Sequence, residues 1–121
     1  MTKYKLSNFD NQVIIEIDKS NNNLDFYVKE WVEFWAGWQT RLQGYGGDYL
    51  TMFLHELSQH LLWLQKTTEY NTHWTLVEFA EREAGFNLLG KHGIRVIDIE
   101  YYSEDYDLEL KIIDETKKEK M

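Results

Sequence analysis

The sequence predicts an α+β protein with the element order β-β-α-α-α-β-β, in which N- and C-terminal hairpins form one antiparallel sheet and helices pack on one of its faces. Apolar and polar residues alternate near both ends of the chain, and helical spacing of apolar residues occupies the middle. A length of 121 residues favours one domain. We expect that domain to span residues 1–116 and residues 117–121 to form a frayed tail.

The first hairpin is predicted from alternation. Apolar residues alternate with polar ones over residues 4–6 and again over 13–18, and Asp10-Asn11 supplies turn chemistry between the two runs. Residues 20–23, one serine and three asparagines, end the second run and are suited to capping a helix.

The first helix is predicted over residues 24–44, where apolar residues recur at alternating spacings of four and three. Its apolar face includes Trp31, Trp35 and Trp38. Tryptophans at this spacing belong more often to a core than to a ligand cage or partner site, so we expect core packing. Gly37 interrupts the helical face, which suggests that another backbone comes close there.

Two more helices are predicted before the last strands. Asp48 is suited to capping a second helix whose apolar stripe runs to about Lys66, and residues 67–73 are expected to form a loop. Thr75 begins a capping-box spacing, and Gly85 is a suitable stop for a short third helix.

The last two strands are predicted as a second hairpin. Residues 94–101 are rich in β-branched side chains, residues 103–105 have turn composition, and residues 106–112 alternate cleanly. We expect the acidic residues of this hairpin to lie on the face of the sheet turned away from the helices. Whether the two hairpins pair with each other stays open.

Negative charge is concentrated near the C-terminus. The chain has a net charge of −8, and residues 96–115 hold eight acids against one base, Lys111. Such a segment repels phosphate, which argues against direct nucleic-acid binding through it, and it suits a basic partner. The candidate partner-binding residues are Asp98, Glu100, Glu104, Asp105, Asp107 and Glu109.

Several kinds of chemistry are excluded or poorly supported by the residues. The chain has no cysteine, so disulfides, thiolate metal sites and cysteine nucleophiles are absent. His55, Glu56 and His60 do not form the zinc-protease motif, because histidines five apart lie about 140° around a helix. Paired carboxylates such as Asp98 and Glu100 can act as acid and base, but no other catalytic motif supports them. We predict no enzyme activity, no metal and no cofactor.

The expected location is the cytoplasm. Residues 1–6 lack the apolar stretch of a signal peptide, and no apolar run approaches the roughly 18 residues that a membrane span needs.

Several segments together resemble a bacterial and phage family known as domain of unknown function 2528. Their order and spacing carry the resemblance, which spans about residues 13–113. The segments are Val13-Ile14-Ile15-Glu16-Ile17-Asp18, the stretch from Lys29 to Gly37, Arg41-Leu42, Gly46-Gly47-Asp48, His92-Gly93-Ile94-Arg95-Val96 and the acidic last strand. The resemblance implies no enzyme activity and an accessory gene of phages, prophages or other mobile elements, in the bacterial host cytoplasm.

Three functional hypotheses follow. The first is a non-enzymatic acidic protein that engages a basic surface of a partner, for example a host defence nuclease, as anti-CRISPR proteins do by mimicking the charge of DNA. The second is a homo-oligomeric structural protein, most simply a dimer, whose aromatic residues form a self-interface. The third is a metal-dependent hydrolase that uses His55, Glu56, His60 and the acidic strand.

Overall fold

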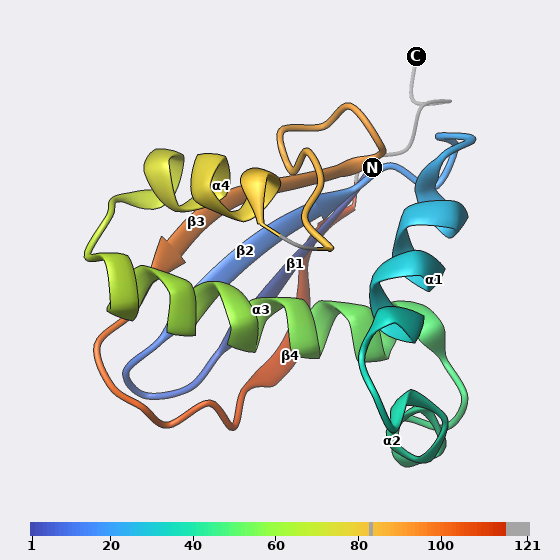
Figure 1. Cartoon of the computed structure of the whole chain (residues 1–121), viewed down its shortest axis with the longest axis horizontal. Helices are drawn as coiled ribbons and strands as arrows, with labels where there is room; N and C mark the ends of the chain where they lie inside the picture. The colour runs from blue at the N-terminus through green and yellow to red at the C-terminus, as the bar shows by residue number, and fades with distance from the viewer. Residues whose placement is uncertain (83, 116–121) are drawn as a thin grey trace.

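The computed structural model describes residues 1–82 and 84–115, which form a four-stranded sheet with helices on one face (Figure 1). The strands are β1 (Thr2–Ser7), β2 (Gln12–Ile17), β3 (Ile94–Glu100) and β4 (Glu109–Glu115). The helices are α1 (Leu24–Phe34), α2 (Trp38–Gly44), α3 (Tyr49–Thr68) and α4 (Thr72–Glu81). The α+β class, the element order and the antiparallel sheet are confirmed. The expected tail, 117–121, lies outside the described residues.

The first predicted helix is broken into α1 and α2, so the expectation of one helix over residues 24–44 is wrong. Trp35 is extended and Gly37 has a φ of 78°, a left-handed conformation that glycine adopts without strain. The guanidinium of Arg41 donates to the carbonyl of Ala36 at 2.6 Å and holds the break together. Gly37 therefore serves a turn between two helices and no close backbone approach.

The boundary between α3 and α4 also differs from the prediction. Helix α3 continues to Thr68, and α4 begins at Thr72, inside the expected loop. Asn71 caps α4 by accepting from the amide of Trp74 at 2.9 Å. Thr75 lies inside the helix, where its hydroxyl donates to the carbonyl of Asn71 at 2.8 Å. The capping-box prediction failed because an asparagine one turn earlier offers the stronger cap.

The last two strands do not pair with each other, so the prediction of a C-terminal hairpin is wrong. The strand order is β3-β2-β1-β4, with every neighbouring pair antiparallel. Strands β3 and β4 therefore form opposite edges of the sheet, and residues 101–108 cross from one edge to the other. We call this segment the C-terminal connection; it replaces the short turn expected at residues 103–105.

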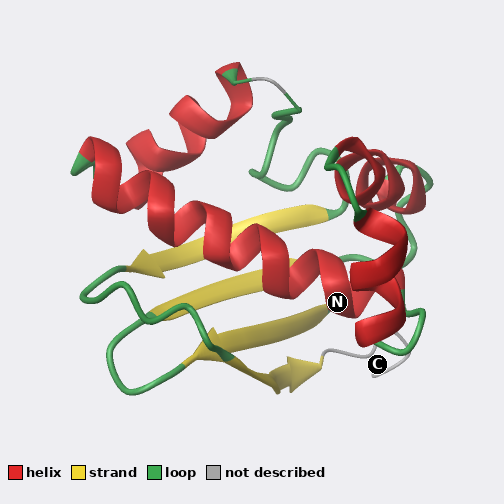
Figure 2. Ribbon diagram, turned by 60° about the horizontal axis from the view of Figure 1, so that its bottom comes forward, coloured by secondary structure: helices red, strands yellow, loops and turns green. Residues whose placement is uncertain are grey.

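The core lies between the sheet and α3, which packs across β1, β2 and β3 (Figure 2). Alternate residues of β1 and β2 point into it, including Leu6 and Ile15, and both are fully buried. Trp31 is 3 % exposed and belongs to this core, as expected. Trp35 and Trp38 are only partly buried and pack against it from outside.

No helix within the described part of the chain is both long enough and apolar enough to cross a membrane.

Candidate functional site

The six candidate acids follow one end of the sheet from edge to edge. Asp98 and Glu100 lie on β3, and Glu109 begins β4 at the opposite edge. Glu104, Asp105 and Asp107 lie between them, in the C-terminal connection. The expectation that all six carboxylates share one sheet face holds only in part. Asp98, Glu100 and Glu109 lie on the face turned away from the helices. The other three lie outside the sheet, because strands at opposite edges need a long connection.

The face of the sheet turned away from the helices is mixed in charge. Each strand contributes to it, with Lys3 and Lys5 on β1, Glu16 on β2, Arg95, Asp98 and Glu100 on β3, and Glu109, Lys111 and Asp114 on β4. Arg95 pairs with Glu16 at 3.0 Å, and Gln12 donates to the carboxylate of Asp98 at 3.0 Å. The positive and negative side chains of this face therefore nearly balance each other, so the face gives no reason to expect a cationic target.

Glu100 is the carboxyl on this face with the clearest electrostatic perturbation. The negative charge of Asp98 and a hydrogen bond between the two side chains raise the pKa of Glu100, while Lys5 opposes the shift. The ionisation of Glu100 therefore depends on the charges of its neighbours Asp98 and Lys5.

Carboxylates also gather where the β1–β2 turn meets the C-terminal connection, and two of them, Glu100 and Glu109, belong to the sheet face as well. These two segments lie side by side in both views, at the end of the sheet opposite α1 (Figures 1 and 2). We call residues 8–11 together with 100–109 the loop end. It carries six carboxylates: Asp10, Glu100, Glu104, Asp105, Asp107 and Glu109.

Asn11 joins the two segments of the loop end. Its side chain is buried, and its amide group donates to the carbonyls of Ser103 at 3.0 Å and Asp105 at 2.7 Å. Its carbonyl oxygen accepts from the backbone amides of Tyr102 at 2.7 Å and Ser103 at 3.1 Å. One side chain therefore satisfies four backbone groups of the connection.

Asn8 repeats this arrangement closer to the surface. Its side-chain oxygen accepts from the amides of Asp10 and Asn11 and shapes the turn, and its amide group donates to the carbonyls of Asp105 and Asp107. Both segments are thus held by asparagine side chains.

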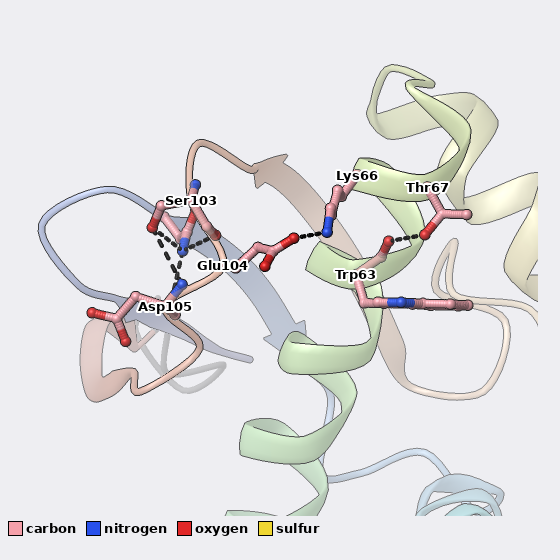
Figure 3. Close-up of polar contacts among 7 residues, drawn as sticks. Trp63, Lys66, Thr67, Ser103, Glu104 and Asp105 are labelled. Carbon is pink, nitrogen blue, oxygen red and sulfur yellow. Dashed lines mark hydrogen bonds and ion pairs between the residues drawn. The ribbon is translucent and has the colours of Figure 1, made fainter.

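Helix α3 fixes the connection from the other side. Gln65 donates to the carbonyl of Ile99 and accepts from the amide of Tyr101, and Gln59 donates to the carbonyl of Tyr106 at 2.8 Å. Lys66 forms an ion pair with Glu104, whereas the carboxylate of Asp105 points away from the helix (Figure 3). The loop end is a well-anchored surface.

Two aromatic rings project from this acidic surface. Phe9 is fully exposed at the tip of the β1–β2 turn, and Tyr102 is 73 % exposed. Open hollows of about 480 and 430 Å³ flank Phe9, one bordered by Asp107 and Glu109 and the other by Glu100 and Tyr102. The loop end therefore combines apolar projections with carboxylates beside them.

Only part of the charge is balanced locally. Lys66 pairs with Glu104, Lys111 lies 3.7 Å from Glu109, and Lys5 acts on Glu100. Among the described residues, no ion pair involves the other three carboxylates, which belong to Asp10, Asp105 and Asp107. The loop end itself contains six acids and no base, and the three neighbouring lysines from β1, α3 and β4 reduce its charge of −6 to −3.

The histidine and glutamate side chains at residues 55–60 point into different surroundings. Glu56 is engaged by Arg41 at 2.9 Å, His55 packs on Tyr45, and His60 lies among the rings of Trp35, Trp63 and Phe79. Within residues 1–82 and 84–115, no three groups of the metal-binding types come together. The side chains proposed for a hydrolase are not assembled into one site.

Three partly buried histidines make stability depend on pH. Desolvation lowers the pKa of His55, His60 and His92 below the ordinary 6.5. The positive charges of Arg82 and Lys91 lower the pKa of His60 and His92 further, respectively. At His55, the negative charges of Asp107 and Glu56 oppose the shift. As the pH falls below 6.5, these histidines take up protons more readily in the unfolded chain than in the folded state. Their contribution to stability is therefore fully present above pH 6.5 and is lost on acidification.

We expect the urea midpoint to fall between about pH 7.5 and about pH 5.5, and less steeply in His60→Phe, which keeps a ring in the aromatic surroundings. Urea titrations at several pH values measure this directly. An equal slope in the variant would show that His60 does not contribute.

Comparison with known proteins adds no relative: the chain matches no protein-family model, no curated protein and no solved structure. The resemblance to domain of unknown function 2528 stays a prediction.

Sequence reasoning missed the residues that organise this surface, namely Asn8, Phe9 and Asn11. A phenylalanine inside an otherwise polar turn was the available signal for an exposed ring. The role of Asn11 had no local signal, because its partners lie about ninety residues away in the chain.

Proposed function

We propose that this protein binds a basic surface of a partner protein through its loop end. The observation that carries the proposal is the placement of two exposed aromatic rings among carboxylates on two mutually anchored segments. A catalytic role has no comparable support in the described residues.

Charge decides the kind of partner. The loop end keeps an excess of negative charge, which repels nucleic acid and attracts lysine- and arginine-rich surfaces. Nucleic-acid-binding proteins present such surfaces. The resemblance to a phage family extends the proposal to a host defence nuclease as the partner, with the loop end taking the place of nucleic-acid phosphates.

The aromatic residues supply the short-range part of the interaction. Tightly bound interfaces depend on a few buried anchors, with tyrosine and tryptophan prominent among them, surrounded by charges that steer and orient the partner. Phe9 and Tyr102 have the exposure that such anchors need before binding. The carboxylate of Asp107 lines a hollow beside Phe9. Neither Asp105 nor Asp107 has an ion pair among the described residues.

Anchoring of the segments favours affinity. A surface that is ordered before binding loses less conformational entropy on association. The hydrogen bonds of Asn8 and Asn11, together with those from α3, fix the backbone that carries the carboxylates.

The test is capture of partners from a host extract by tagged protein at low and high salt. The first variant is Asp105→Lys with Asp107→Lys, and the second is Phe9→Ser. Because all three residues are exposed, both variants are expected to fold. We expect a salt-sensitive partner to be retained by the wild type and its affinity to fall about tenfold to a hundredfold in each variant.

A matched control distinguishes the effect of changing the loop end from the effect of changing the net charge of the protein. Asp25→Lys with Glu81→Lys changes the charge by the same amount at exposed positions of α1 and α4, away from the loop end. Capture that responds equally to both charge changes, or to neither, contradicts the proposal. Retention of only salt-insensitive proteins also contradicts it.

A further inference from the structure

A second surface feature lies on α1, at the opposite end of the sheet from the loop end (Figure 1). A hollow of about 170 Å³ opens between α1 and residues 84–86, and we call it the α1 groove. Five aromatic residues and one glutamate are among those that line it: Phe26, Tyr27, Trp31, Phe34 and Phe86, with Glu30.

Helical spacing explains the outer rim of the groove. Phe26, Glu30 and Phe34 are four residues apart, so they form one row along α1 with the carboxylate between two phenyl rings. Phe26 is 59 % exposed and Phe34 is 45 % exposed. Two large apolar side chains in one row on solvent-exposed helix surface are unusual unless something covers them.

The inner wall is preformed by ring packing. Tyr27 contacts Phe26 at 5.1 Å and Phe86 at 5.2 Å between ring centroids, and Phe86 packs edge-on against Phe79 at 5.5 Å. Gly85 lets residues 84–86 turn back closely against the end of α4, because a Cβ there would lie 1.8 Å from the carbonyl oxygen of Phe79. The groove is therefore held open between fixed elements.

The chain places its own cations over aromatic rings elsewhere. The amino group of Lys29 lies 5.4 Å from the ring of Tyr49, and the guanidinium of Arg82 lies 5.9 Å from that of Trp63. In the described ranges, no such cation occupies the α1 groove and no ion pair involves Glu30. Aromatic faces with an adjacent carboxylate attract organic cations.

We propose that the α1 groove binds the cationic side chain of a lysine or arginine presented by a peptide or protein. Its size supports a single side chain, since pockets for whole drug-sized ligands begin at about 300 Å³. Glu30 pairs with the charge, and the exposed rings of Phe26 and Phe34 contact the aliphatic part and the cation. This assignment is independent of the loop end.

The test follows the indole N–H signal of Trp31 by NMR during titration with acetylated arginine amide and acetylated lysine amide. Acetylated citrulline amide is the neutral probe of similar shape, and tetramethylammonium is the free small cation. We expect saturable shifts with at least one of the two amino-acid cations and no saturation with citrulline over the same range.

Variants on α1 locate the response. Glu30→Gln and Phe34→Ala each change an exposed residue, so folding is expected to persist, and each is expected to weaken binding at least about threefold. Glu33→Gln is the matched control on the same helix, outside the groove, and Phe9→Ser is the control for losing an exposed ring.

Three results would overturn the assignment. The first is no saturable shift with either amino-acid cation. The second is binding that is unchanged in Glu30→Gln and Phe34→Ala. The third is a response to tetramethylammonium alone, which would exclude a side chain as the ligand. Because Phe9→Ser leaves the groove untouched, failure here is distinguishable from failure at the loop end.

Discussion

Replacing Trp31 with alanine is expected to lower the free energy of unfolding by about 3–5 kcal/mol, the range for deleting a large aromatic side chain from a core. The ring is 3 % exposed and packs edge-on against Phe53 at 5.8 Å and Trp35 at 5.7 Å. Helices α1 and α3 pack on each other through this core, so the deleted ring leaves a cavity between them. Urea or thermal unfolding measures the loss.

Trp38 provides the matched control from the same predicted stripe. It lies on α2, is partly buried, and has Tyr49 as its ring neighbour at 6.2 Å. Trp38→Ala is expected to cost about 1 kcal/mol, in line with a typical substitution outside the core. Equal losses for the two variants would contradict the distinction between a core tryptophan and a peripheral one.

Asn11→Ala is expected to cost about 2–4 kcal/mol, because the change removes four hydrogen bonds and leaves buried backbone groups without partners. The side chain is 2 % exposed and bonds to the backbone of Tyr102, Ser103 and Asp105. Denaturant unfolding gives the total loss, and hydrogen exchange at the amides of Tyr102 and Ser103 shows whether the loop end opens locally.

Asn11→Asp tests the same contacts by replacing the side-chain amide with an ionisable carboxyl group. A carboxylate oxygen would replace the amide group that faces the carbonyls of Ser103 and Asp105, so the folded state disfavours the ionised form and the pKa of the new carboxyl is raised. Relative to the wild type, the variant is then least destabilised below about pH 4, and the difference grows as pH rises. Wild-type stability at every pH would contradict the role of Asn11 as a hub.

Local patterns predicted most of the elements. Alternation at residues 13–17 marked the side chains that β2 buries, and the stripe at residues 50–64 marked the buried face of α3. The break at Gly37 was missed, because a helical spacing of apolar residues can continue across a turn when both helices pack on one core. Asn71 was missed as a cap because Thr75 offered a more familiar pattern.

The sequence predicted which acidic residues the candidate site contains, but the predicted arrangement of all these residues on one sheet face was wrong. The excess of carboxylates in residues 96–115 is a property of the sequence, and so is their opposition to nucleic acid. Their division between a neutralised sheet face and a charged loop end depends on Lys5, Arg95 and Lys66, which come from other elements.

The sequence by itself determined the α+β class, the alternation that buries one face of each strand, the absence of cysteine chemistry and the place of the negative charge along the chain. Only the tertiary structure decided that β3 and β4 occupy opposite edges and that Asn11 organises the loop end. The reason is physical: alternation records which side of a strand is buried, but it does not record which strand lies beside it.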